Sequence, residues 1–137
     1  MICALDSNVM KSLFLQKEQS IDSFIIRLRT KSMGHGFIIP PIVFYEIQRW
    51  LLAKKMYAKE RSFSELCKML TVGDFSYDVW VKATEVYAYL TQRGNQIPDA
   101  DILSASFCLV NGYAIIADDK HFEYIVPLGL KYIKWEQ

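Results

Sequence analysis

The chain has 137 residues, close to the size expected of one domain, and 52% of them are hydrophobic, which is enough for one sizeable core. Sixteen basic and 15 acidic residues give a formal net charge of +1, so any contact with nucleic acid must rely on a local basic surface. The longest nearly unbroken apolar run, "FIIPPIVFY", contains two prolines and is far shorter than the ~20 residues of a membrane span. No secretory signal is visible, so we expect a single cytoplasmic domain over residues 1–137.

Short apolar runs alternate with longer helical patterns along the chain, which is typical of βαβ units and a mostly parallel sheet. The opening "MICAL" predicts a first strand, a helical pattern follows to about Lys31, and "GFIIP" predicts a second strand that ends at Pro40. Pro41 suits the first turn of a helix, because its missing N–H needs no partner there, and the helical pattern continues over residues 42–59. A further helix is expected over residues 62–70, with a short third strand near "LTVGDF".

The second half of the chain predicts two more helices and two more strands. "YDVWVKATEVYAYLTQRG" indicates an amphipathic helix, because apolar residues recur at spacings of three and four until Gly94. "DADILSASFCLVNG" predicts the next helix, and "YAIIA" and "KYIKW" predict the fourth and fifth strands. The predicted fold class is therefore α/β: a three-layer α/β/α sandwich with a mostly parallel central sheet of four to five strands. The apolar residues of the amphipathic helix are Trp80, Ala83, Tyr87 and Leu90, and the next helix is closed by Asn111 and Gly112.

Neither the cysteines nor the histidines form a zinc or nucleophile pattern. Cys3, Cys67 and Cys108 are odd in number and far apart, without CxxC spacing, and we interpret them as reduced thiols of the core. His35 and His121 have no partner at catalytic spacing, and we assign neither a role.

Acidic residues stand at four places where elements begin or end. Asp6 follows the first strand, Glu46 lies inside "PPIVFYEIQRW", "PDADILSA" opens a helix with two aspartates, and "ADD" follows the fourth strand. A single aspartate at such a place is most often a helix cap or turn residue. For Glu46 the alternative is a partly exposed ion pair with Arg49 at i+3. The aspartates of the last two sites are Asp99 and Asp101, and Asp118 and Asp119.

The four places together are more informative than any one of them. Ligands of open parallel sheets bind beyond the carboxyl ends of the strands, where the strand order reverses. If the first strand is central, with the second and third on one side and the fourth and fifth on the other, Asp6 and Asp119 are neighbours there. Two carboxylates ~4 Å apart repel by about 4 kcal/mol at an effective dielectric near 20, so such a cluster must protonate or bind a cation. An all-oxygen site suits Mg²⁺ or Mn²⁺, which can activate water against a phosphodiester.

At these residues the sequence resembles the PIN-domain ribonucleases, and more narrowly the VapC toxins of bacterial toxin–antitoxin pairs. "LDSN" resembles the opening D-[ST]-N of the family, "PPIVFYEI" its second strand and glutamate-bearing helix, and "DADILSASFCLVNGYAIIADDKHF" its D-x-L-I-A-A helix, glycine stop, strand and T-x-D-x-x-F turn. The closing "VPLGLKYIKW" is also similar. The resemblance spans nearly the whole chain and implies an Mg²⁺- or Mn²⁺-dependent endoribonuclease. It also implies a homodimer and a groove for the C-terminal segment of a cognate antitoxin.

The resemblance assigns the four metal-binding acids by position: Asp6, Glu46, Asp101 and Asp119. It also implies that Ser7 and Asn8 steady Asp6 through hydrogen bonds. The "DAD" and "ADD" runs leave the third and fourth ligands open to Asp99 and Asp118; residues two apart on a helix face different ways, and we prefer Asp99 as the helix cap. One departure is Ala117, where the family has a threonine.

Three further expectations concern binding and alternative functions. Arg49, Lys54 and Lys55 belong to a basic cluster that we interpret as an RNA-binding surface, although a solvated helix face explains it equally well.

A PIN-like module that binds RNA or protein without cutting is the alternative function. A phosphatase with an aspartate nucleophile is more remote, because that chemistry needs Asp-x-Asp after the first strand and this chain has Asn8. Some of the apolar side chains of the helix predicted over residues 42–59 should be exposed for partners, from a set that includes Phe44, Leu51, Leu52 and Tyr57.

Overall fold

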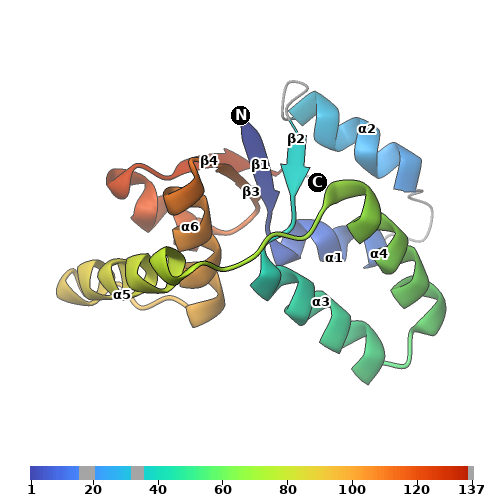
Figure 1. Cartoon of the computed structure of the whole chain (residues 1–137), viewed down its shortest axis with the longest axis horizontal. Coiled ribbons are helices and arrows are strands. Elements are labelled where there is room, and N and C mark those ends of the chain that lie inside the picture. Colours follow the sequence, from blue (N-terminus) through green and yellow to red (C-terminus); the bar gives the residue numbers. More distant parts are fainter. Residues whose placement is uncertain (16–20, 32–35, 136–137) are drawn as a thin grey trace.

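The strand β1 (Ile2–Leu5) lies inside a four-stranded sheet whose strands are all parallel. It pairs with β2 (Gly36–Ile38) on one side and with β3 (Ala114–Ala117) on the other, and β4 (Lys131–Lys134) pairs with β3. The strand order β2-β1-β3-β4 therefore reverses direction at β1, as predicted. The computed structural model describes residues 1–15, 21–31 and 36–135, and Figure 1 shows helices on both sides of this sheet.

Successive side chains of each strand point to opposite faces of the sheet, and each face is covered by its own set of helices. Cys3 and Leu5 of β1 point into a core shared with α1 to α4, whereas Ala4 points into a core shared with α5, α6 and η1. The strand β3 divides in the same way, so the sheet is buried on both faces, as parallel sheets are. This confirms the predicted α/β class and its three layers. The helices are α1 (Ser7–Leu15), α2 (Ile21–Lys31), α3 (Pro41–Ala53), α4 (Tyr57–Leu70), α5 (Tyr77–Gln92), α6 (Asp99–Asn111) and the 3₁₀ helix η1 (Lys120–Leu128).

The predicted helix over residues 42–59 is wrong at its end, because the chain breaks between α3 and α4. Lys55 adopts a left-handed conformation with φ of 56°. Its N–H donates to the carbonyl of Leu52, and the N–H of Met56 donates to the carbonyl of Leu51. These two bonds form a Schellman ending, which usually needs glycine and which the lysine gave no reason to expect.

Two other predicted elements also differ. The third strand near "LTVGDF" is reduced to an isolated parallel bridge between Ile39 and Val72. The single helical pattern up to Lys31 is two helices, α1 and α2, and residues 16–20 between them lie outside the described residues, as does His35. Among the described residues, no helix is both long enough and apolar enough to cross a membrane.

The helix α5 buries a different stripe from the predicted one. Ala83 and Leu90 face the core as expected, but Trp80 and Tyr87 are 51% and 57% exposed. Val79 and Val86 take the buried places instead. Trp80 and Tyr87 therefore line the surface between α5 and α6.

Candidate metal centre

Asp6 is carried to the site by the central strand. Its N–H donates to the carbonyl of Ile116 in β3 at 3.0 Å, and its side chain is buried. Burial, together with the charges of Asp101 and Asp119, raises the pKa of Asp6 to about 7. Its Oδ2 atom is buried and has no hydrogen-bond partner among the residues that the structure describes.

The residues after Asp6 support its carboxylate through their backbones. The N–H groups of Ser7 and Asn8 donate hydrogen bonds that lower the pKa of Asp6 and so favour its ionised form. These N–H groups belong to the first turn of α1, where donors have no partner within the helix. The "SN" pair therefore acts at Asp6 through the start of a helix.

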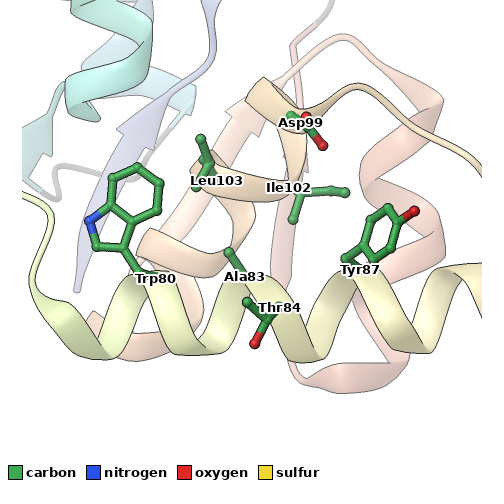
Figure 2. Close-up of a pocket in the computed structure, with 7 residues that line it drawn as sticks. All are labelled: Trp80, Ala83, Thr84, Tyr87, Asp99, Ile102 and Leu103. Carbon is green, nitrogen blue, oxygen red and sulfur yellow. The ribbon is translucent and has the colours of Figure 1, made fainter.

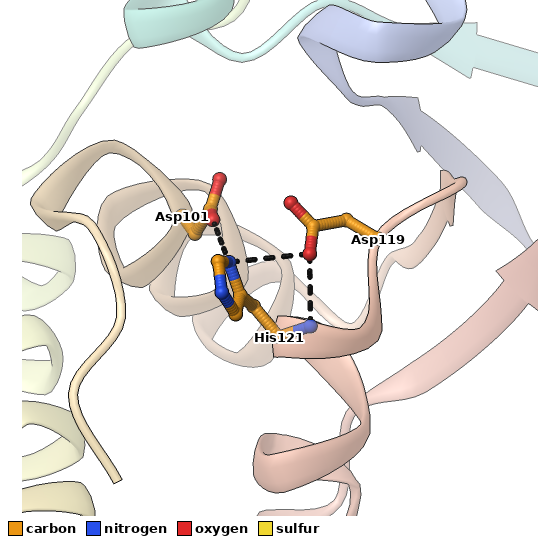
Figure 3. A group of neighbouring side chains, drawn as sticks. All are labelled: Asp101, Asp119 and His121. Atoms are coloured by element: carbon orange, nitrogen blue, oxygen red, sulfur yellow. Dashed lines mark hydrogen bonds and ion pairs between the residues drawn. The ribbon is translucent and has the colours of Figure 1, made fainter.

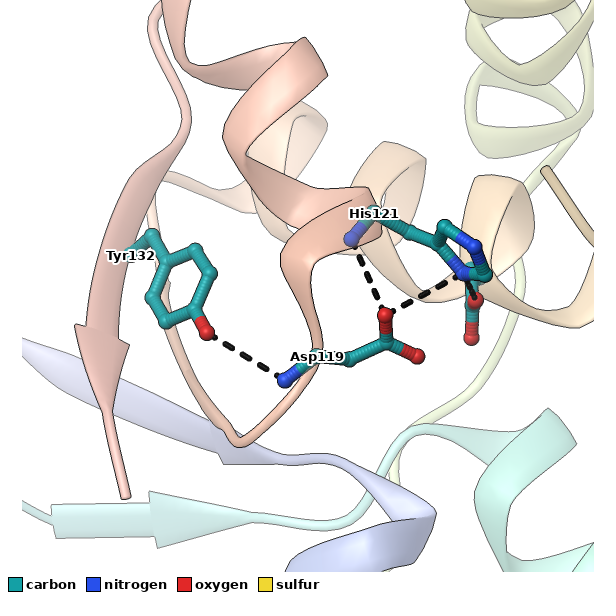
Figure 4. A network of polar contacts seen from close by, with 4 residues as sticks. Asp119, His121 and Tyr132 are labelled. Carbon is teal, nitrogen blue, oxygen red and sulfur yellow. Dashed lines mark hydrogen bonds and ion pairs between the residues drawn. The ribbon is translucent and has the colours of Figure 1, made fainter. Parts of the chain in front are cut away.

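Asp119 is held in the turn that follows β3. Its N–H donates to the hydroxyl of Tyr132 in β4 at 3.2 Å, and its Oδ1 accepts from the N–H of His121 at 2.9 Å (Figure 4). The second bond makes Asp119 the N-cap of η1. Its neighbour Asp118 is exposed, so of the two aspartates in "ADD" it is Asp119 that faces the site.

Asp101 and Asp119 meet across the imidazole of His121. The Nδ1 atom of His121 lies 3.0 Å from Oδ2 of Asp101 and 3.2 Å from Oδ1 of Asp119 (Figure 3). Burial raises the pKa of Asp101, the hydrogen bond from His121 lowers it, and the charge of Asp119 raises it. One atom from each of the three residues lies within 4.8 Å of the other two, close enough to bind one metal ion.

Glu46 approaches the same group from α3. Its side chain is half-buried, which raises its pKa, while the charges of Lys11 and Arg49 lower it and that of Asp101 raises it again. All four predicted acids are thus linked electrostatically through Asp101. The structure adds His121, Tyr132 and Lys11 to this site. Only His121 had a signal in the sequence, its place two residues after Asp119.

Asp99 belongs to a different surface. It is the first residue of α6, where Pro98 is the N-cap and no side chain forms a capping hydrogen bond, so the prediction that Asp99 caps the helix is wrong. It borders an apolar groove of about 320 Å³ between α5 and α6 (Figure 2). Asp101 is therefore the aspartate of "DAD" that joins the acidic group. The other residues of the groove are Trp80, Ala83, Thr84, Tyr87, Ile102 and Leu103.

The donor set fits a hard divalent cation. Carboxylates arrive from β1, α3, α6 and the turn after β3, and one buried oxygen, Oδ2 of Asp6, lacks a partner. Such an oxygen is costly to bury ionised, and a cation offsets that cost. Of the four acids predicted to hold the ion, Asp101 and Asp119 lie in one group with His121, and Asp6 and Glu46 are connected to that group only through their charges, so a shared ion remains a prediction.

Comparison with known structures identifies the fold. The protein superposes with a TM-score of 0.84 and 23% identity on a chain of the VapBC2 structure from Rickettsia felis, which is bound to a DNA fragment. The superposition covers 99% of the present chain and 100% of the Rickettsia felis chain. The chain has the fold of the VapC-type PIN-domain proteins. VapBC-1 from nontypeable Haemophilus influenzae gives a TM-score of 0.83 at 19% identity, with both chains fully covered.

A similarity in sequence agrees with the VapC fold. Ribonuclease VapC1 of Methanocaldococcus jannaschii is 26% identical over 126 residues, which span 85% of this chain and 90% of the relative. No family model matches the chain. The recognition of a VapC-type PIN fold from "LDSN" and the later acidic motifs is thereby confirmed.

Proposed function

We propose that this protein is a metal-dependent endoribonuclease that hydrolyses RNA phosphodiester bonds, and that it is the toxin of a type II toxin–antitoxin pair. The observation that carries the proposal is the buried, unpartnered Oδ2 atom of Asp6, in the electrostatic field of Asp101 and Asp119. A carboxylate placed in this way either takes up a proton or binds a cation. The likeness to a relative named as a ribonuclease supports the second reading.

Mg²⁺ or Mn²⁺ is the cofactor we propose, held by the four acids. A divalent cation there supplies Lewis-acid chemistry, by lowering the pKa of water and neutralising charge on a phosphodiester. The acids differ in surroundings: Asp6 is buried, whereas Glu46 is half-buried beside two cationic side chains. Glu46 therefore marks the side from which an anionic substrate approaches.

Lys11 and Arg49 are the substrate contacts we propose on that side. Each lies beside an aromatic ring, with Nζ of Lys11 at 5.5 Å from the centroid of Trp50 and Cζ of Arg49 at 4.9 Å from that of Tyr45. Both act on Glu46 through their charge, so an RNA phosphate at the acids also meets two cations. Lys54 and Lys55 lie at the far end of α3, ~12 Å beyond Glu46, and we predict that they contact RNA away from the cleaved bond.

A cognate antitoxin and a second copy of the chain are the partners we propose. One solved structure of the same fold, from Mycobacterium tuberculosis, is described as a member of the VapBC family of toxin–antitoxin systems, and the two structures compared above are also named VapBC, which supports an antitoxin partner. Of the four apolar residues expected to face partners, Leu51 is buried and the other three are exposed on α3 and α4, where they fit an amphipathic segment: Phe44, Leu52 and Tyr57. The product of an adjacent gene should bind this surface, and substitution of Leu52 by Asp should abolish binding without loss of ribonuclease activity.

Sequencing of RNA 5′ ends after expression in cells tests the activity. The wild type should produce new cleavage ends and growth arrest, Asp6→Asn should produce neither, and the exposed Asp118→Asn should match the wild type. Cleavage by well-folded Asp6→Asn protein, purified from contaminating ribonuclease, would leave a binding module as the better account.

A further inference from the structure

The carboxylates of Asp101 and Asp119 each use only one oxygen toward His121. Oδ2 of Asp101 and Oδ1 of Asp119 face the Nδ1 atom of the ring. Figure 3 shows the second oxygen of each carboxylate pointing away from the imidazole. Each of the two carboxylates therefore has one oxygen that faces His121 and one oxygen that points away from it.

We propose that His121 is a positioning residue that sets the metal affinity of this site. Its Nδ1–H binds one oxygen of each carboxylate, which orients Asp101 and Asp119 so that their remaining oxygens, together with Oδ2 of Asp6, bind the cation. The inference rests on the proposed function, because it concerns the same cation. His121 acts through the two aspartates and is not itself a ligand.

The turn that carries His121 is rigid enough for this task. The backbone N–H of His121 donates to Oδ1 of Asp119 at 2.9 Å, so the backbone and the ring of His121 both contact the same carboxylate. The next residue, Phe122, is fully buried and packs edge-on against Tyr132, with ring centroids 6.1 Å apart. Tyr132 in turn accepts the N–H of Asp119 (Figure 4). The imidazole is therefore fixed relative to β3, β4 and α6.

The unpartnered atom of Asp6 is the independent sign that an ion belongs beside this frame. The side chain of Asp6 is 2% exposed, and the charges of both aspartates that His121 binds act on it. Hydrogen bonds to the carboxylate ligands of a metal commonly alter affinity by ~10–100-fold when removed. His121 supplies such bonds to two of the proposed ligands at once.

Isothermal titration of the whole protein with Mn²⁺ and with Mg²⁺ tests the inference. His121→Ala should weaken binding of both ions by ~10–100-fold. His121→Asn should restore most of the affinity, because its amide nitrogen is as many bonds from the backbone as Nδ1. Lys120→Ala, on the same turn and exposed, is the matched control and should bind like the wild type.

Three results would overturn the positioning role. Wild-type affinity in His121→Ala would show that the imidazole does not orient the ligands. Loss of Mn²⁺ binding alone, with Mg²⁺ unaffected, would make the ring a ligand, since imidazole favours the softer ion. If His121→Asn failed to restore binding, the shape of the ring and not its Nδ1–H hydrogen bonds would account for the loss of affinity in His121→Ala. The proposed function stands in all three cases, because in each of them the wild type still binds the ions; a wild type that binds neither ion would contradict the proposed function instead.

Discussion

Replacing Asp6 by asparagine should stabilise the protein when no metal is bound. Asparagine keeps the shape of the side chain and one acceptor oxygen but removes the charge. The pKa of Asp6 is 3.8 in an exposed peptide and about 7 in the fold. At pH 8 the carboxylate is ionised in both the folded and the unfolded protein, so the free energy of unfolding is lowered by the full amount that corresponds to the raised pKa. At ~1.4 kcal/mol per pH unit, this amounts to about 4 kcal/mol.

The sign of the pH dependence follows from the same two values. Between pH 3.8 and about 7 the folded protein retains a proton on Asp6 that the unfolded chain has lost, so the free energy of unfolding falls as the pH rises. Below this window both states are protonated and the cost disappears. The advantage of Asp6→Asn should therefore shrink from about 4 kcal/mol at pH 8 to under about 2 kcal/mol at pH 5.

Urea unfolding in EDTA at the two pH values measures this difference directly. Asp118→Asn removes the same charge from an exposed position in the same region and should change the unfolding free energy by less than about 0.5 kcal/mol. With Mn²⁺ at 100 times its Kd the wild type should gain ~2.7 kcal/mol that Asp6→Asn does not gain, so the difference at pH 8 should narrow to about 1 kcal/mol. An Asp6→Asn protein that is no more stable than the wild type at pH 8 in EDTA would refute the electrostatic reasoning, whatever its activity.

Three further outcomes are expected. Saturating Mn²⁺, at 100 times its Kd, should add ~2.7 kcal/mol to the unfolding free energy of the wild type, and calorimetry before and after EDTA would detect it; an unchanged melting point would show that the acids form no common site. In a ribonuclease assay Asp119→Asn should be inactive while Asp99→Asn keeps wild-type rates, and equal loss in both would reassign the third ligand. Gly73→Ala should lose ~1–3 kcal/mol in urea unfolding, because a Cβ there would lie 2.6 Å from Cζ of Phe107; a loss below ~0.5 kcal/mol would mean that this ring moves aside.

The positions of Asp6 and Asp119 could be predicted because strand ends are visible in the sequence. "MICAL" and "YAIIA" are short apolar runs bounded by acids, and parallel strands end at one edge of their sheet, so proximity followed from topology. Helix ends marked by glycine could also be predicted from the sequence, as at Gly112, which has a φ of 73°. These features depend on local chemistry that a sequence states directly.

The remaining details depend on contacts that no local pattern encodes. Lys55 ends α3 in a left-handed conformation without glycine, because the bonds of Lys55 and Met56 to the last turn of the helix stabilise it. Trp80 is exposed although its spacing suits a buried stripe, since Val79 takes the core position. The contact between His121 and Asp101 exists only because the turn after β3 packs against α6, and the place of His121 two residues after Asp119 was its one sign in the sequence.

The register of the sheet ties the assembly of the site to the synthesis of the chain. β1 is made well before its partner β3, because Cys3 pairs with Ala114 across most of the described residues. Contacts between residues so far apart in sequence form late in folding, because a long loop must close first. A nascent chain that has emerged only as far as α5 already holds Asp6 and Glu46, but it lacks Asp101, Asp119 and the strand that brings them together. A translation product interrupted before α6 therefore has half of the proposed acids, and the proposed cation site can form only after β3 and the turn that follows it have left the ribosome.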